Sequence, residues 1–237
     1  GTYPFVTSAD CSLNGLARNA GVEKSDLAFT LAVTKAPYMT RVGHGPFTTE
    51  LGGVASDDWC NNPVVNRAFE EEKFPDRSIN SEDDFYQGIA IRRAGGEFGT
   101  TTQRPRRVGW LDLPLLRYAA RFTGRDLILT KVDVLDECEV IKICSSHRYD
   151  GPDYRVGERT LKSGDIFQVA IPDPEVLNHC RPIYHEMPGW LCSTRGITCK
   201  ADLPEKLVAI IRFIEREADV SVKAVSLGPG RSEVVVM

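Results

Sequence analysis

The sequence lacks several features that would assign it at once to a large class of proteins. Across its 237 residues, no apolar run reaches the length of a membrane span, and no signal peptide opens the chain. There is no G-x-x-x-x-G-K-[ST] phosphate loop, no internal repeat and no low-complexity linker. Hydrophobic residues make up 42% of the chain, enough for a substantial core. We therefore expect one domain over residues 1–237, with no membrane partner.

Paired cysteines are also missing. The chain has seven cysteines, an odd number, and no C-x-x-C pair, so neither a disulfide framework nor a zinc ribbon is expected. His179, Cys180 and His185 are close in sequence but lack the spacing of metal ligands. We assign no metal site to this chain, and reduced thiols indicate a cytoplasmic protein.

An excess of positive charge is absent as well. The net charge is −4, which argues against a nucleic-acid partner, because that would require a basic face. The basic residues instead cluster at 92–107, an arrangement that suits a small anion.

The most informative stretch is Gly95–Asp112, GGEFGTTTQRPRRVGWLD. Its glycines and Pro105 break regular structure and predict a loop. Thr100–Thr102 offer three hydroxyl donors, and Arg104 and Arg106 offer planar guanidiniums that match carboxylate or phosphate groups. The stretch predicts an anion-binding loop, and a basic surface turn is the alternative.

Two further polar stretches follow predicted strands. Residues 127–129 form a short apolar run, typical of a buried strand, which ends at Lys131-Val132-Asp133. Residues 220–225 alternate as a strand and lead into Ser226-Leu227-Gly228. Open α/β sheets bind ligands at the carboxyl ends of their strands, so both stretches are candidate binding segments.

Helix signals are clearest where caps and apolar stripes coincide. We predict helices at 25–33, 64–73, 83–93, 112–123 and 202–219, with Ser25, Asp112 and Asp202 as N-caps. Strands are predicted at residues 3–6, 140–144, 166–171 and 234–236. The acidic 52–94 segment is predicted to be a surface insertion, its paired carboxylates being typical of a solvated face.

Motifs along the whole chain resemble those of one protein family, and they occur in the same order. EFGTTTQRPRRVGWLD is similar to the aspartate-binding loop of adenylosuccinate synthetases. GTYPFVTS, KAPYMTRVGHGPFTTEL, TKVD, YHEMPGW and SLGPG resemble other stretches of that family. The resemblance implies an α/β fold related to P-loop NTPases, with a mixed, mainly parallel central sheet and flanking helices.

The resemblance also implies an activity and a set of site residues. The activity is a GTP-dependent ligase reaction: the 6-oxygen of inosine monophosphate (IMP) is phosphorylated, and L-aspartate then displaces phosphate to give adenylosuccinate. Thr7 and Arg104 would bind IMP, and Lys131, Val132, Asp133, Ser226, Leu227 and Gly228 would bind GTP together with Arg106. Aspartate would be bound by Thr100, Thr101, Thr102, Gln103, Arg104, Pro105 and Arg106.

The family's catalytic residues and magnesium ligands have no counterpart here. We therefore expect the chain to be the C-terminal portion of a longer homodimeric enzyme, inactive by itself, with Mg²⁺ bound by the preceding part. Gln103 stands where the family usually has glycine, and Leu227 where threonine is common. These departures leave two alternatives open: a viral-type ligase using another purine monophosphate such as dGMP, and a non-catalytic guanine-nucleotide-binding module.

Overall fold

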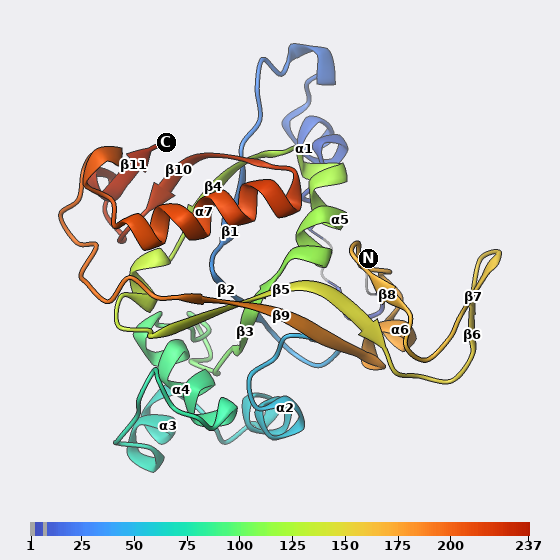
Figure 1. Ribbon diagram of the computed structural model, residues 1–237, viewed down its shortest axis with the longest axis horizontal. Helices are drawn as coiled ribbons and strands as arrows, with labels where there is room; N and C mark the ends of the chain where they lie inside the picture. The colour runs from blue at the N-terminus through green and yellow to red at the C-terminus, as the bar shows by residue number, and fades with distance from the viewer. Residues whose placement is uncertain (1–2, 7–8) are drawn as a thin grey trace.

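The computed structural model, which describes residues 3–6 and 9–237, divides most of the strands between two sheets (Figure 1). The first sheet has the order β1 (Ala32–Lys35), β4 (Asp126–Thr130), β10 (Ser221–Ser226) and β11 (Val234–Val236). β1, β4 and β10 are parallel, and β11 is antiparallel to β10. The carboxyl ends of the three parallel strands therefore lie along one edge.

The second sheet is mostly antiparallel and begins directly after β1. A cis Ala36-Pro37 bond joins β1 to its first strand, and only the β3–β5 pair in this sheet is parallel. The sheet has the order β2-β3-β5-β8, with β9 paired to β5, and a separate hairpin joins β6 to β7. The bounds are β2 (Tyr38–Arg41), β3 (Arg107–Asp112), β5 (Val140–Tyr149), β6 (Tyr154–Val156), β7 (Arg159–Leu161), β8 (Ile166–Phe167) and β9 (Cys180–Pro188).

Helix α7 (Glu205–Ala218) lies across the first sheet, and helix α5 (Leu113–Thr123) packs against α7 and against β5 of the second sheet (Figure 1). α5 begins where its residues predict, because the Asp112 carboxylate accepts a hydrogen bond from Leu115 N at 2.9 Å. The apolar faces of both helices join the buried strand residues of β4 and β10 in one core. The prediction of a mixed α/β fold with flanking helices is confirmed.

The predicted helix at 25–33 is wrong. Only the 3₁₀ turn η1 (Lys24–Asp26) is helical there, and the chain then extends because β1 pairs with β4. Asp202 is not the cap of α7: it lies in η3 (Lys200–Asp202), and the extended backbone of Pro204 precedes the helix.

Two predicted strands also differ. Residues 3–6 form turns and a bend instead of a strand, and the strand predicted at 166–171 is reduced to β8. Sequence patterns did not reveal α1 (Leu13–Ala20) or α2 (Gly53–Asn61). The remaining short helices are η2 (Val132–Leu135), α6 (Pro174–Asn178) and η4 (Arg231–Glu233). Within the described residues, no helix is long and apolar enough to cross a membrane.

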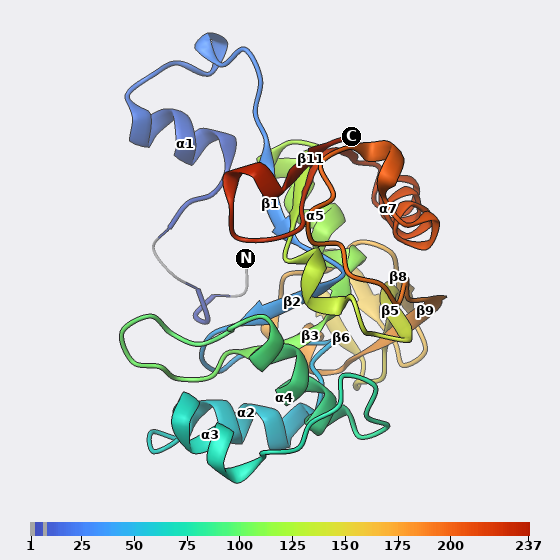
Figure 2. The same ribbon diagram turned by 90° about the vertical axis from the view of Figure 1, so that its left-hand side faces the viewer.

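The 52–94 segment folds into three helices, α2, α3 (Arg67–Lys73) and α4 (Asp84–Ala94), gathered at one end of the molecule (Figures 1 and 2). Its centre is an ion pair between Arg92 Nη1 and Glu70 Oε2 at 2.5 Å, with both side chains almost completely buried. Trp59 Nε1 donates a second hydrogen bond to the same carboxylate oxygen at 2.7 Å. This carboxylate therefore joins α2, α3 and α4.

Removing the Glu70 carboxylate should leave the buried Arg92 cation without its partner. We expect Glu70→Ala to lower the free energy of unfolding by about 3–5 kcal/mol, the usual cost of breaking a buried pair from one side. Glu72→Ala is the control, because Glu72 lies exposed on the same helix and should change stability by less than about 0.5 kcal/mol. Urea unfolding of both variants measures the difference, and equal losses would contradict the assignment.

Candidate functional site

The parallel pairing of β4 with β10 places the two predicted binding segments side by side. β4 leads into Lys131–Asp133 and β10 leads into Ser226–Gly228, and both strands end at the same edge of the sheet. Lys131 takes a left-handed backbone conformation, with φ of 62°, and its Nζ donates to Gly95 O at 2.7 Å. The sheet edge is thereby tied to the start of the loop at residues 95–106, the Thr/Arg loop.

Asp133 presents a half-buried carboxylate at this edge. Burial and the charge of Asp136 raise its pKa, while a hydrogen bond from its own backbone and the charges of Lys131 and Arg195 partly offset this shift. In the described part of the chain, no other residue donates a hydrogen bond to its side chain. The carboxylate is thus free to accept two donors from a ligand.

The Ser226–Gly228 turn is shaped by Gly228 and by Glu233. A Cβ at Gly228 would lie 2.4 Å from Glu233 Oε1, so only glycine fits here without rearrangement. Ser226 Oγ donates to Gly228 O at 2.9 Å, and Leu227 N donates to Glu233 O at 2.8 Å. The Leu227 side chain is buried in the core, as is that of Val132, so both offer a ligand only main-chain atoms.

The Thr/Arg loop connects α4 to β3 and stands out from the body of the molecule (Figure 2). It closes on itself, because Gly99 N donates to Arg104 O and Gln103 N donates to Gly99 O, both at 2.9 Å. Residues 100–104 are exposed at its tip, whereas Pro105 is buried. Arg104 Nη2 donates to Asn61 O at 3.1 Å, which leaves its other donors available.

A buried carboxylate connects this loop to the sheets. Glu97 Oε2 accepts hydrogen bonds from Lys35 Nζ and Arg106 Nη1, each at 2.8 Å, and Glu97 Oε1 accepts one from Tyr38 OH at 2.7 Å. Lys35 is the last residue of β1 and pairs with Thr130, the residue before Lys131. The Glu97 carboxylate therefore links Arg106 to Lys35, which lies at the same sheet edge as Asp133.

The network around Glu97 contains two cations, Lys35 and Arg106, and one anion, and burial shifts the pKa values of Glu97 and Lys35. Burial acts to raise the pKa of Glu97, but hydrogen bonds from Lys35 and Tyr38 and the charge of Lys35 outweigh it and lower the pKa below its ordinary value. Burial lowers the pKa of Lys35, against the opposing effect of Glu97. Two cations face one anion, so the network keeps a positive charge between the loop and the sheet edge.

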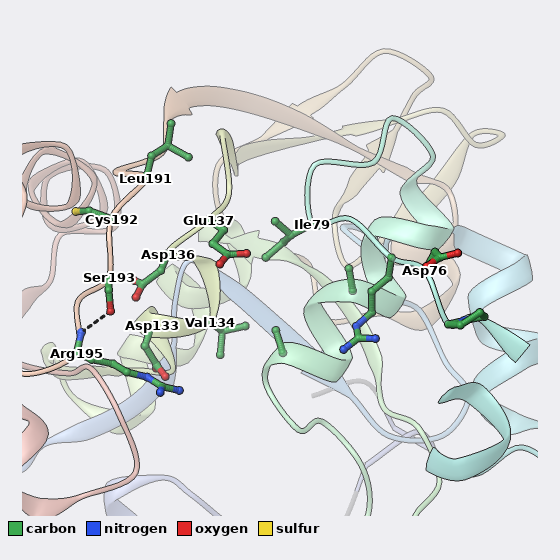
Figure 3. A pocket seen from close by; sticks show the side chains of 14 residues that line it. Asp76, Ile79, Asp133, Val134, Asp136, Glu137, Leu191, Cys192, Ser193 and Arg195 are labelled. Carbon is green, nitrogen blue, oxygen red and sulfur yellow. Dashed lines mark hydrogen bonds between the residues drawn. The ribbon is translucent and has the colours of Figure 1, made fainter. Parts of the chain in front are cut away.

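A cleft of about 1070 Å³ extends from Asp133 across to the 75–79 segment (Figure 3). Its other wall is the loop that contains Ser193 and Arg195, and the Arg195 side chain points toward Asp133. This wall is held by Asp136, whose carboxylate accepts hydrogen bonds from Trp190 Nε1 and Thr194 N, both at 2.8 Å. Asp136 thus fixes the wall to the segment that carries Asp133.

One group of potential metal ligands occurs among the described residues. Ligand atoms of Asp112, Cys144 and His147 lie within 4.8 Å of one another, and all three side chains are buried. The Asp112 carboxylate already caps α5 and bonds His147 Nε2 at 2.8 Å. These contacts give the cluster a role in holding α5 on β5.

The structure brings together the residues nominated for GTP and leaves those at the loop tip farther away. Lys131, Asp133 and Ser226–Gly228 share one edge, and Arg106 reaches it through Glu97. Arg104 and Thr100–Gln103 lie farther out on the loop. Thr7 lies outside the described residues.

Sequence reasoning missed Lys35, Tyr38, Glu97, Asp136 and the cleft wall at 191–195. Glu97 lies within the glycine-rich stretch that predicted the loop, but its three partners are between 9 and 62 residues away in the sequence. Only the fold shows that they meet.

The lowered pKa of Glu97 predicts a pH-dependent stability. An ionised Glu97 stabilises the folded state fully above its ordinary pKa of 4.5, and this contribution is lost as the pH falls through the lower folded value. We expect the stability difference between the unmodified protein and Glu97→Gln to be constant from pH 5 to 7 and to shrink below about pH 4.5. Urea titrations across this range measure it, and a difference that grows in acid would exclude the prediction.

The chain is similar to known proteins over its whole length. All of the chain aligns with adenylosuccinate synthetases from Ralstonia nicotianae and Solibacter usitatus, each at 37% identity. The alignments cover 45% and 44% of those proteins, so the chain spans less than half the length of these curated relatives. The structure of fully ligated adenylosuccinate synthetase from Plasmodium falciparum matches with a TM-score of 0.72 and 30% identity, over 100% of this chain and 46% of that one.

The family match itself is nearly continuous. Residues 1–235 match the family described as adenylosuccinate synthetase. The chain therefore belongs to the adenylosuccinate synthetase family.

Proposed function

We propose that the polypeptide carrying this chain is a GTP-dependent ligase that joins IMP and L-aspartate to form adenylosuccinate. The observation that supports this most strongly is the parallel pairing of β4 and β10, which places Asp133 beside the Ser226–Gly228 turn. Guanine has two adjacent donors that adenine lacks, and a free carboxylate accepts both. The edge of the sheet therefore suits the base of GTP.

The Thr/Arg loop suits the other substrates. Thr100–Gln103 and Arg104 would bind the carboxylates of aspartate, because hydroxyls and a guanidinium match them in geometry and charge. Arg104 would also contact the phosphate of IMP, as would Thr7. Arg106, held by Glu97 with one amino group, has further donors for GTP.

In the proposed reaction, GTP phosphorylates the 6-oxygen of IMP, and the amine of aspartate then displaces that phosphate. The residues of this chain would orient the reactants and neutralise negative charge, which contributes proximity and electrostatic stabilisation. We propose a cytoplasmic homodimer, as the family resemblance implies. Nucleic acid is an unsuitable partner, because the net charge of the chain is −4.

Magnesium, which the resemblance also implies, requires oxygen ligands and retains bound water. The group formed by Asp112, Cys144 and His147 offers a thiol and an imidazole and is closed to solvent. It does not fit this ion. We therefore propose that the magnesium ligands lie outside this chain.

Arg104→Leu in the natural full-length polypeptide tests the ligase. We expect kcat/KM for adenylosuccinate formation to fall by about 10- to 100-fold, since a hydrogen bond to a charged group contributes about 1.5–3 kcal/mol. Arg212→Leu, an exposed substitution on α7, should leave activity unchanged. A protein that only binds guanine nucleotides would show no aspartate-dependent turnover, and its GTP affinity would not respond to Arg104→Leu.

Asp133→Asn tests recognition of the base. Replacing one carboxylate oxygen with an amide removes an acceptor for guanine and adds a donor that suits xanthine. We expect the kcat/KM for GTP to fall about 10- to 100-fold and XTP to become the better substrate. Equal loss with both nucleotides would indicate a structural role for Asp133 instead of base recognition.

A further inference from the structure

The 52–94 segment contacts the Thr/Arg loop through three hydrogen bonds. Arg104 Nη2 donates to Asn61 O at 3.1 Å, Arg67 N donates to Gln103 O at 3.1 Å, and Arg92 Nε donates to Arg106 O at 2.6 Å. Two of the three bonds are accepted by main-chain atoms of the loop itself. The segment therefore holds the backbone of the loop as well as one of its side chains.

The groups that hold the loop are themselves fixed. Arg92 is buried and paired with Glu70, so its guanidinium cannot follow a moving loop. Arg67 is the first residue of α3, and the Asn66 side chain caps that helix by accepting from Phe69 N at 3.0 Å. The first N–H groups of a helix have no partner within it, and here the loop supplies one.

The loop takes an unfavourable backbone conformation at the point of contact. Gln103 has φ of 53°, in the left-handed region that residues other than glycine and asparagine rarely adopt. Hydrogen bonds secure it on both sides, from Gln103 N to Gly99 O and from Arg67 N to Gln103 O. The guanidinium of Arg67 also lies 5.7 Å from the ring centre of Phe98, at the base of the loop.

We propose that the 52–94 segment is a clamp that sets the Thr/Arg loop in one conformation before a dicarboxylate binds, with Arg67 as a positioning residue. The clamp rests on the proposed function in its choice of ligand, L-aspartate. Its physical effect is preorganisation: a loop ordered in advance loses less conformational freedom on binding. The clamp acts on affinity for aspartate and leaves the chemical step unchanged.

The test compares Arg67→Pro with Arg67→Ala in the full-length polypeptide. Both variants remove the guanidinium, but only proline removes the N–H that bonds Gln103 O. Proline is tolerated at the first position of a helix, and the preceding Asn66 is already extended, with φ of −133° and ψ of −179°. The pair therefore isolates one hydrogen bond without breaking α3.

Relative to Arg67→Ala, we expect Arg67→Pro to raise the KM for aspartate about three- to tenfold, with kcat within about twofold. Amide hydrogen exchange at residues 99–106 should accelerate by a similar factor, while exchange in α5 and α7 stays the same. Identical KM values and identical loop exchange in the two variants would overturn the clamp.

Two further outcomes are informative. If the unmodified protein shows no aspartate-dependent turnover, the proposed function fails, and loop exchange still decides whether the clamp exists. If Arg67→Pro does not fold, the unmodified protein decides: the amide of Arg67 should exchange slowly, because its hydrogen bond to Gln103 O must open first. Fast exchange at Arg67 would refute the clamp.

Discussion

The arrangement of the site depends on one buried charge, the carboxylate of Glu97. It accepts hydrogen bonds from Lys35 at the end of the first sheet, from Tyr38 in the second sheet and from Arg106 in the Thr/Arg loop. Burying a carboxylate costs free energy unless it is paired. The position of Glu97 therefore fixes the positions of Lys35, Tyr38 and Arg106. The two sheets and the loop therefore have one common point, and it lies beside the edge that carries Asp133.

The sequence predicts the elements whose signals are local. α5 follows from a capping aspartate and an early proline, and β4 from a short apolar run. The wrong predictions arise where pairing with a strand distant in the sequence determines the local structure. The residues at 25–33 carry a helix cap, yet the chain extends there because β4 offers a parallel partner for β1. α2 gives no signal, since it begins at two glycines and has no apolar stripe.

In the candidate site, too, the sequence predicts some features and misses others. Residue types and motifs nominate Asp133, Arg104 and Arg106, because their side chains carry the relevant chemistry. They do not show the contacts from Asn61 O or Arg67 N, because a main-chain carbonyl or amide is present in every residue and leaves no trace in composition. The role of the 52–94 segment is visible only in the folded chain, where its main-chain groups lie against the loop.

The burial of Leu227 limits what this position can offer a ligand. Its side chain packs in the core while its peptide lines the turn, so the choice of amino acid at this position is governed by interior volume. An aliphatic residue in place of a hydroxylated one then reflects how the neighbouring strands fill space. In this chain, a ligand at the turn can therefore meet position 227 only through its main-chain atoms.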